Sequence, residues 1–230
     1  MTKFFIVAAS LAIASLIPAA SASEKREAKT PIDWSGIYAG INGGYSWGAT
    51  HYRYSNSGDN YGVDSSKNFE SGIYGAEILL NKQVGSLVFG ISSGLSRISA
   101  DTTAQLLYRG NSAPNYNYYE SSIRSFSLTQ LRAGYAFDNL LFSASAGIAT
   151  GRWSYSDRGN ASKTQTRLGL ALGASLDYAI TKEVSIDAKF SHMIFGNEVK
   201  LIYYNDPNNY SAHKSSFSVF MLGLKYKFIN

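Results

Sequence analysis

The chain has 230 residues and no cysteine; 45% of its residues are hydrophobic, 14% aromatic and 16% charged. The lack of cysteine excludes a disulfide framework and a thiolate metal site. The formal net charge is +5, but the basic residues are scattered along the chain, so the composition does not favour nucleic-acid binding.

The first residues have the pattern of a secretory signal peptide. Lys3 supplies a positive charge, residues 4–17 form an apolar run, and Ala20 and Ala22 form an A-x-A cleavage site. This apolar run is short for a helix that must span about 30 Å of hydrocarbon, so we expect cleavage after Ala22 rather than an N-terminal membrane anchor.

These signals divide the chain into three parts. We expect residues 1–22 to be removed, residues 23–33 to form a short periplasmic segment and residues 34–230 to form one domain. No later segment has roughly 18 consecutive apolar residues, so any membrane crossing would have to use strands rather than helices.

The first predicted strand lies within residues 34–48, WSGIYAGINGGYSWG. Its odd-numbered positions carry Ile37, Ile41, Tyr45 and Trp47, whereas the positions between them are mostly Gly, Asn and Ser. Alternation with a period of two is typical of a strand, because successive side chains point to opposite faces of the sheet. One face is therefore apolar, and the other is small and polar.

Seven further segments repeat this alternation over about 9–11 residues each, the length that a tilted strand needs to cross a membrane. They lie near residues 72–80, 87–95, 128–137, 142–149, 168–180, 184–191 and 220–228. The segment at 72–80 is the least regular, because Glu77 interrupts its pattern and is the position where a β-bulge is expected.

The lengths of the connections distinguish a soluble sandwich from a membrane barrel. Long polar connections at 48–68, 99–122, 152–166 and 196–214 alternate with tight turns at 82–86, 138–139 and 181–183. Strict alternation puts four long extracellular loops at one end and both termini at the other, which predicts an eight-stranded antiparallel up-and-down transmembrane β-barrel. A Greek-key sandwich would mix the two kinds of connection. Side chains fill so narrow a barrel, so we expect no open pore.

The sequence resembles a family of small alphaproteobacterial outer-membrane barrel proteins, which contains major surface antigens and hemin-binding proteins. The resemblance rests on DWSGIYAGINGGYSWG, LRAGYAFDNLLFSASAGIATG, GLALGASLDYAITKEVSIDAKFSH and the terminal GLKYKF. It implies a location in the cell outer membrane, in contact with outer-membrane lipid. It also implies that Gly223, Tyr226 and Phe228 form the signal by which the barrel-assembly machinery recognises the last strand, although Ile229 and Asn230 follow the final aromatic residue here.

Charged residues on the inward faces of the strands need partners, because an unpaired buried charge costs several kcal/mol. We predict a network near the periplasmic end of the lumen that joins Asp177 and Asp187 with Lys189, Arg132 and Lys225. The alternative is that these charges are separately solvated in a wet lumen.

The sequence shows no arrangement typical of catalysis. The three histidines, His51, His192 and His213, stand in no recognisable hydrolase motif, so we expect a protein that is not an enzyme. The position of His192 after Phe190 indicates a residue of the outer aromatic girdle. Function is therefore expected in the loops, which carry much Tyr, Asn and Ser.

We expect these loops to serve a structural and surface-displaying role that needs no metal or cofactor. One alternative is hemin capture, which the resemblance implies and which Tyr or His ligation of iron would allow. The candidate ligands are His51, His213, Tyr116, Tyr118 and Tyr119. Further alternatives are an adhesin that contacts host surface proteins, because Tyr-rich and Ser-rich surfaces adapt well to protein partners, and a porin-like protein.

Overall fold

The computed structural model describes residues 32–55, 62–108, 115–157, 161–203 and 206–229, and Pro31–Asn230 form one compact unit. The predicted signal peptide, with Ala20 and Ala22, lies outside the described residues. In the described part of the chain no helix has the length and hydropathy to cross a membrane.

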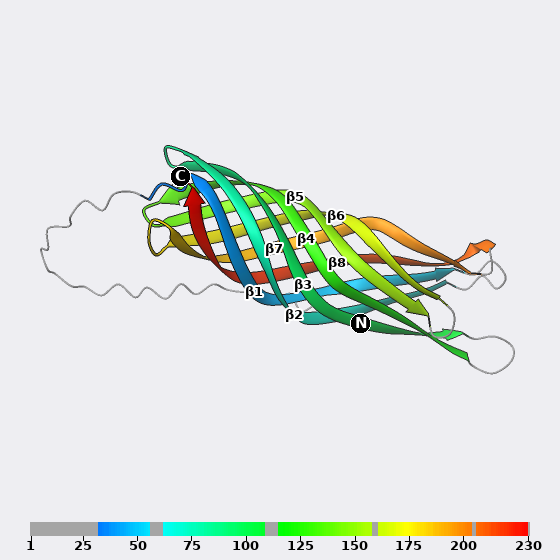
Figure 1. The fold of residues 1–230 in the computed structure, drawn as a ribbon. Coiled ribbons are helices and arrows are strands. Elements are labelled where there is room, and N and C mark those ends of the chain that lie inside the picture. The colour runs from blue at the N-terminus through cyan, green and yellow to red at the C-terminus, as the bar shows by residue number, and fades with distance from the viewer. Residues whose placement is uncertain (1–31, 56–61, 109–114, 158–160, 204–205, 230) are drawn as a thin grey trace, which may run out of the picture. The chain divides into compact units, whose positions relative to one another are not determined.

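Eight antiparallel strands close into a barrel in chain order, which confirms the predicted topology (Figure 1). They are β1 (Gly36–Ser55), β2 (Gly62–Val84), β3 (Leu87–Tyr108), β4 (Asn115–Phe137), β5 (Leu140–Asp157), β6 (Ala161–Ala179), β7 (Val184–Tyr203) and β8 (Asp206–Ile229). Because β8 also pairs with β1, the membrane-spanning part has no free edge, as hydrocarbon requires of any strand structure.

The strands contain 18 to 24 residues, about twice the predicted length. The prediction that long loops begin near Gly48 and its counterparts was wrong, since β1 continues to Ser55 and β2 begins at Gly62. Beyond the membrane a strand needs no apolar outer face. The outer parts of these strands are therefore polar, and their sequence does not show the alternation that predicts a strand. The tight turn at Asp138 was predicted correctly; the φ of Asp138 is 51°, in the left-handed region that Asp tolerates.

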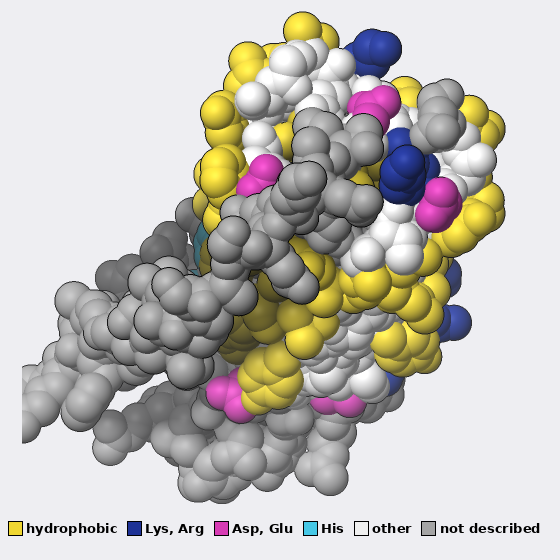
Figure 2. All heavy atoms as spheres, turned by 90° about the vertical axis from the view of Figure 1, so that its left-hand side faces the viewer, with side chains coloured by type: hydrophobic (Ala, Val, Ile, Leu, Met, Phe, Trp, Pro, Cys, Tyr) yellow, Lys and Arg dark blue, Asp and Glu magenta, His cyan; other side chains and the backbone are white. Residues whose placement is uncertain are grey.

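The outer face of the barrel is apolar, as the alternation predicted. On β6, for example, Leu170 is 68% exposed, whereas its neighbour Ala171 is completely buried. Figure 2 views the end that carries the tight turns and shows hydrophobic side chains around the periphery of the ring. In a membrane barrel such an outer surface faces acyl chains.

Glu77 does not mark a β-bulge, which corrects the sequence-based expectation. β2 pairs with β1 from Asn81 to Gly62 without a register shift, and it pairs regularly with β3 as well. Glu77 instead lies on the inward face, next to the inward-facing Ile73 and Leu79. The pattern looked irregular because this inward face carries apolar residues on both sides of a charged one.

The lumen is filled in three layers. Near the tight turns Trp34 packs with Val88, Leu141 and Ala179. A charged layer follows, and the outer half holds a larger apolar cluster. The aromatic members of this outer cluster are Phe69, Phe126, Trp153, Phe195 and Phe217.

The outer end of the barrel divides into two sheets. β2 pairs with β3 only as far as Ile73 and Ile98, and β6 pairs with β7 only as far as Leu170 and Ile194. Beyond these positions the described strands form one sheet of β7, β8, β1 and β2 and another of β3, β4, β5 and β6, which diverge in Figure 1.

Aromatic rings in the outer cluster join these two sheets. The ring of Phe126 on β4 contacts that of Phe217 on β8 at 5.5 Å between centroids. Trp153 on β5 contacts Phe195 on β7 at 5.7 Å, and both pairs are edge-to-face. Such pairs add about 0.5–1.5 kcal/mol beyond the burial of their area, so they hold the outer extension together where strand pairing ends.

Candidate functional site

A network of charged side chains crosses the middle of the lumen. It contains Glu77 of β2, Arg132 of β4, Asp177 of β6, Asp187 and Lys189 of β7, and Lys225 of β8. Three of these side chains are cationic and three are anionic, so the network balances its own charge. Such balance is what allows ionised groups to remain inside a barrel that side chains fill.

Lys225 is at the centre of this network. Its Nζ lies 2.6 Å from Asp177 Oδ1, 3.3 Å from Asp187 Oδ1 and 3.5 Å from Glu77 Oε1. Arg132 donates a hydrogen bond of 2.7 Å to the other oxygen of Asp177, and Lys189 pairs with Glu77. One ammonium group thus contacts carboxylates from three different strands.

The strand register explains how Lys225 reaches these partners. Asp177 pairs with Asp187 across β6 and β7, which brings two carboxylates together. Gly40 of β1 pairs with both Lys225 and Glu77, and an added Cβ at Gly40 would lie 2.9 Å from Lys225 Cγ. A glycine at this position leaves the space through which the lysine side chain passes.

The structure brings together Asp177, Arg132 and Lys225 from the predicted set, but it pairs Lys189 differently. Among the described side chains no ion pair joins Asp187 to Lys189, whose partner is Glu77. Sequence reasoning missed Glu77 as a luminal residue. The inward-facing residues of β2, such as Ile73 and Leu79, have odd residue numbers. Glu77 also has an odd residue number, and this parity was the signal that could have placed it in the lumen.

The segment before β1 closes the end of the lumen that carries the tight turns. Trp34 is only 2% exposed and packs against Val88, Leu141 and Ala179, which lie on three different strands. The chain turns inward at Gly36, whose φ of +137° is strained for any residue with a Cβ. The Trp-Ser-Gly sequence therefore forms a plug that is joined to the first strand.

Hydrogen bonds hold this plug in place. The backbone N–H of Trp34 donates to Gln83 Oε1 at 2.7 Å, and the hydroxyl of Tyr38 donates to the carbonyl of Trp34 at 3.1 Å. From the last strand, Lys227 donates to the carbonyl of Asp33 at 2.8 Å. The plug is thus bonded to the beginning and to the end of the barrel sheet.

The candidate hemin ligands are divided between the two outer sheets. In the register of β1 and β8, His51 pairs with Lys214 and Tyr52 with His213. Tyr116, Tyr118 and Tyr119 belong to β4, in the other sheet. The side chains of His213 and of these tyrosines lie outside the described residues, so hemin ligation stays a prediction.

His192 lies on the outward face of β7 between the exposed Phe190 and Ile194, which agrees with a place in the outer girdle. Its Nδ1 is 2.8 Å from the hydroxyl oxygen of Ser218 on β8. Among the described contacts of His192 no carboxylate orients the ring, which a hydrolytic triad requires.

The predicted assembly signal on β8 also has structural contacts. The rings of Tyr226 and Phe228 meet edge-to-face at 4.9 Å on the outer surface. An added Cβ at Gly223 would lie 2.4 Å from Asp187 Oδ1, so the charged layer requires a glycine at this position. Recognition of these residues by the assembly machinery stays a prediction.

Comparison with known proteins agrees with this architecture. Residues 6–228 match the family model described as outer membrane protein beta-barrel domain. The chain is 26% identical over 214 residues to the 31 kDa outer-membrane immunogenic proteins of Brucella melitensis biotype 1 and Brucella suis biovar 1, and the match covers 86% of each chain. In fold it is similar to the outer membrane protein OprG from Pseudomonas aeruginosa, with a TM-score of 0.51, 11% identity and coverage of 84% of this chain and 96% of that one.

Proposed function

We propose a display function for this chain, which belongs to the outer membrane protein beta-barrel domain family and lies in the cell outer membrane. In this proposal it is a non-enzymatic protein that presents its outer strand ends on the cell surface. The Brucella relatives fit the small alphaproteobacterial group within this family. The proposal concerns what the barrel does there beyond crossing the membrane.

The extension of the strands past the membrane is the observation that carries this proposal. A tilted strand crosses the hydrocarbon with about 9–11 residues, whereas β1 has 20 and β8 has 24. The apolar outer face of β1 ends near Trp47, and the strand continues to Ser55. The additional length builds two sheets that share an aromatic core, and this supports a role in holding the connections between the strands away from the membrane.

The lumen supports display rather than transport. Trp34, the charged layer and the aromatic cluster fill three successive levels of the interior. The Brucella relatives are described as immunogenic, and exposed strand ends of this kind would present such a surface on this chain as well. In this proposal the displayed surface would also be available to bind a host protein.

Labelling of single cysteines tests the proposed display, because the natural chain has no cysteine. Asp101→Cys lies on the outer part of β3 and Asp138→Cys in a turn at the opposite end, and both native side chains are exposed. On intact cells a membrane-impermeant maleimide should modify the first variant and not the second, while both should react after lysis. Equal labelling of both variants on intact cells would contradict the proposal.

Hemin capture is supported by the resemblance alone, and the division of its candidate ligands between two sheets does not favour it. Titration of refolded protein with hemin separates the two functions. A Soret shift that His51→Ala or Tyr118→Phe abolishes would replace display by hemin binding as the main function. An unchanged Soret band at micromolar hemin would leave display as proposed.

A further inference from the structure

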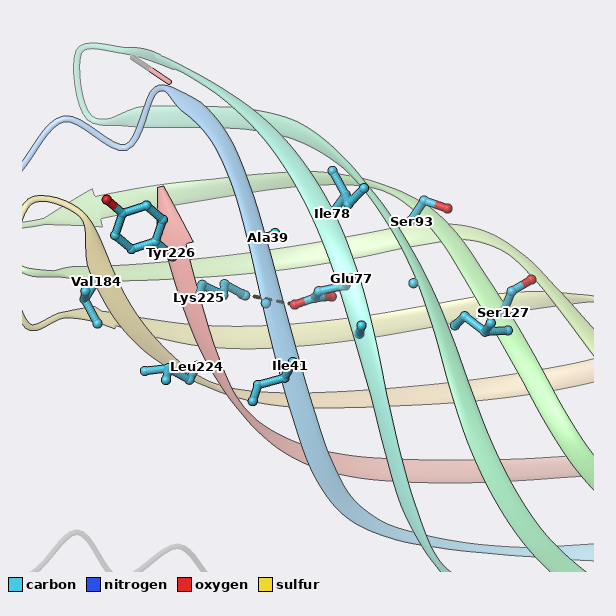
Figure 3. A pocket seen from close by; sticks show the side chains of 14 residues that line it. Ala39, Ile41, Glu77, Ile78, Ser93, Ser127, Val184, Leu224, Lys225 and Tyr226 are labelled. Atoms are coloured by element: carbon cyan, nitrogen blue, oxygen red, sulfur yellow. Dashed lines mark ion pairs between the residues drawn. The ribbon is translucent and has the colours of Figure 1, made fainter. Parts of the chain in front are cut away.

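An apolar groove crosses the outer face of the barrel over β8, β1, β2 and β3 (Figure 3). Its volume is about 710 Å³, within the range of sites that hold small ligands. Two rows of register partners form its sides. They are Tyr226, Ala39, Ile78 and Ser93 in one row, and Leu224, Ile41, Ala76 and Leu95 in the other.

Small side chains interrupt the large ones in these rows and give the groove its depth. Ile41, Ile78 and Leu95 project from the surface and are more than 60% exposed. In the register Ala39 lies between Tyr226 and Ile78, and Ala76 lies between Ile41 and Leu95, so both positions add little height to the wall. The groove is therefore a property of several strands and not of one small residue.

The two serine hydroxyls that line the groove are paired with threonine hydroxyls on the neighbouring strands. Ser93 and Thr129 share a hydrogen bond of 3.1 Å, and Ser127 and Thr150 share one of 2.5 Å. Glu77 and Lys225 line the floor, but their charged ends take part in the luminal network. Because unsatisfied polar groups are costly in hydrocarbon, this pairing suits a groove that faces acyl chains.

The position of the groove indicates its occupant. It is continuous with the apolar outer face, the surface that meets the membrane. Its periplasmic end lies at Val184 and Tyr226, two residues from the exposed Lys182. Lys182 supplies an exposed cation in this turn, beside Glu183, which accepts a hydrogen bond from the hydroxyl of Thr181. A lysine close to the headgroup region of a membrane attracts lipid phosphates.

We propose that this groove binds one acyl chain of a glycerophospholipid in the periplasmic leaflet, with the lipid phosphate beside Lys182. The bound chain fills the space over Ala39 and Ala76, where an empty groove would lose dispersion contacts. The bound lipid covers the wall of β8, β1 and β2 directly outside the charged layer. This inference rests on the outer-membrane location and is independent of surface display.

Photo-crosslinking tests the proposal on the full mature chain in vesicles of phosphatidylethanolamine and phosphatidylglycerol. The probe is a phospholipid with a diazirine in its acyl chain. We expect crosslinks to concentrate on peptides that contain Ala39, Ala76 and Leu224, and Ala76→Leu to reduce them several-fold. Ala144→Leu is the matched control, because Ala144 is also exposed on the outer face but lies on β5. Gel mobility with and without heating verifies that each variant is folded.

Two results would overturn the proposal. Crosslinks spread evenly over all eight strands, or unchanged by Ala76→Leu, would show ordinary boundary lipid without a site. The methyl ester of a diazirine fatty acid, which has no charged headgroup, provides the second arm. Lys182→Ala should weaken crosslinking by the phospholipid and leave that by the methyl ester unchanged. If Lys182→Ala affects both probes equally, the phospholipid headgroup is not part of the site.

Discussion

The Nζ atom of Lys225 on β8 lies 2.6 Å from Oδ1 of Asp177 on β6, and each side chain is only 2% exposed. These strands are not neighbours in the sheet, because β7 lies between them. The ion pair therefore reaches over a strand inside the lumen. It connects the last strand to the barrel independently of the backbone pairing of β8 with β7 and β1.

Removal of the Lys225 charge should destabilise the barrel strongly. Lys225→Met leaves three buried carboxylates with only two cations, and loss of one partner of a buried pair typically costs about 3–5 kcal/mol. Urea unfolding in lipid vesicles measures this change. The exposed Lys182→Met is the control and should change the free energy of unfolding by less than about 0.5 kcal/mol. A similar effect of both variants would contradict a buried network.

A double-mutant cycle should show that Lys189 is coupled to Glu77 rather than to Asp187. Residues in direct ionic contact couple by about 0.5–3 kcal/mol, and the structure pairs Lys189 with Glu77. The cycle of Glu77→Gln with Lys189→Met should give a clearly larger coupling energy than that of Asp187→Asn with Lys189→Met. The reverse order would support the pairing that the sequence suggested.

Truncation of the plug should destabilise the protein through a cavity. Trp34 is almost completely buried against Val88, Leu141 and Ala179, and Trp→Ala in a packed core typically costs about 3–5 kcal/mol. Trp47, which is 40% exposed on the outer face, provides the matched control as Trp47→Ala. Urea unfolding should show the larger loss for Trp34→Ala. Equal losses would mean that Trp34 does not pack in the lumen.

The filled lumen should not conduct ions. Three layers of side chains occupy the interior among the described residues, and an eight-stranded barrel leaves no aqueous channel when it is filled in this way. Planar-bilayer recording of the purified protein should therefore show no steady conductance. Reproducible open-channel steps from verified monomers would contradict the proposed display role and favour a porin-like one.

Asp33, outside the membrane-spanning strands, should add a small pH dependence. The backbone N–H of Ser35 donates a hydrogen bond of 2.9 Å to Asp33 Oδ1, and this bond lowers the pKa of Asp33 below its ordinary value of 3.8. A carboxyl with a lowered pKa in the folded state stabilises that state above pH 3.8, and the contribution disappears as the pH falls through the folded pKa.

The comparison of the wild type with Asp33→Asn measures this effect. Urea unfolding at several pH values should show a difference between the two proteins above pH 3.8 that shrinks below it. If the difference in the free energy of unfolding between the two proteins stays constant across this pH range, the effect does not come from ionisation of Asp33.

The sequence determined the membrane-spanning part of this protein. In β6 the leucines from Leu168 to Leu176 alternate with small residues, which predicts a strand with one apolar face and one small face. The alternation of long and short connections then defined the meander. The alternation of apolar and small residues did not reveal the strands beyond the membrane. Polar strands such as the outer part of β1 need no apolar face, so they resemble loops in sequence.

Only the tertiary structure decided which luminal residues meet. Alternation assigns a side chain to a face, but it gives neither the height of that side chain in the barrel nor the partner across the lumen. Lys225 reaches Asp177 on β6 and Glu77 on β2 because strand register and the glycine at position 40 bring these chains together. The inward turn of Trp34 depends in the same way on the backbone of Gly36, since a period of two describes strands and not the segment that precedes them.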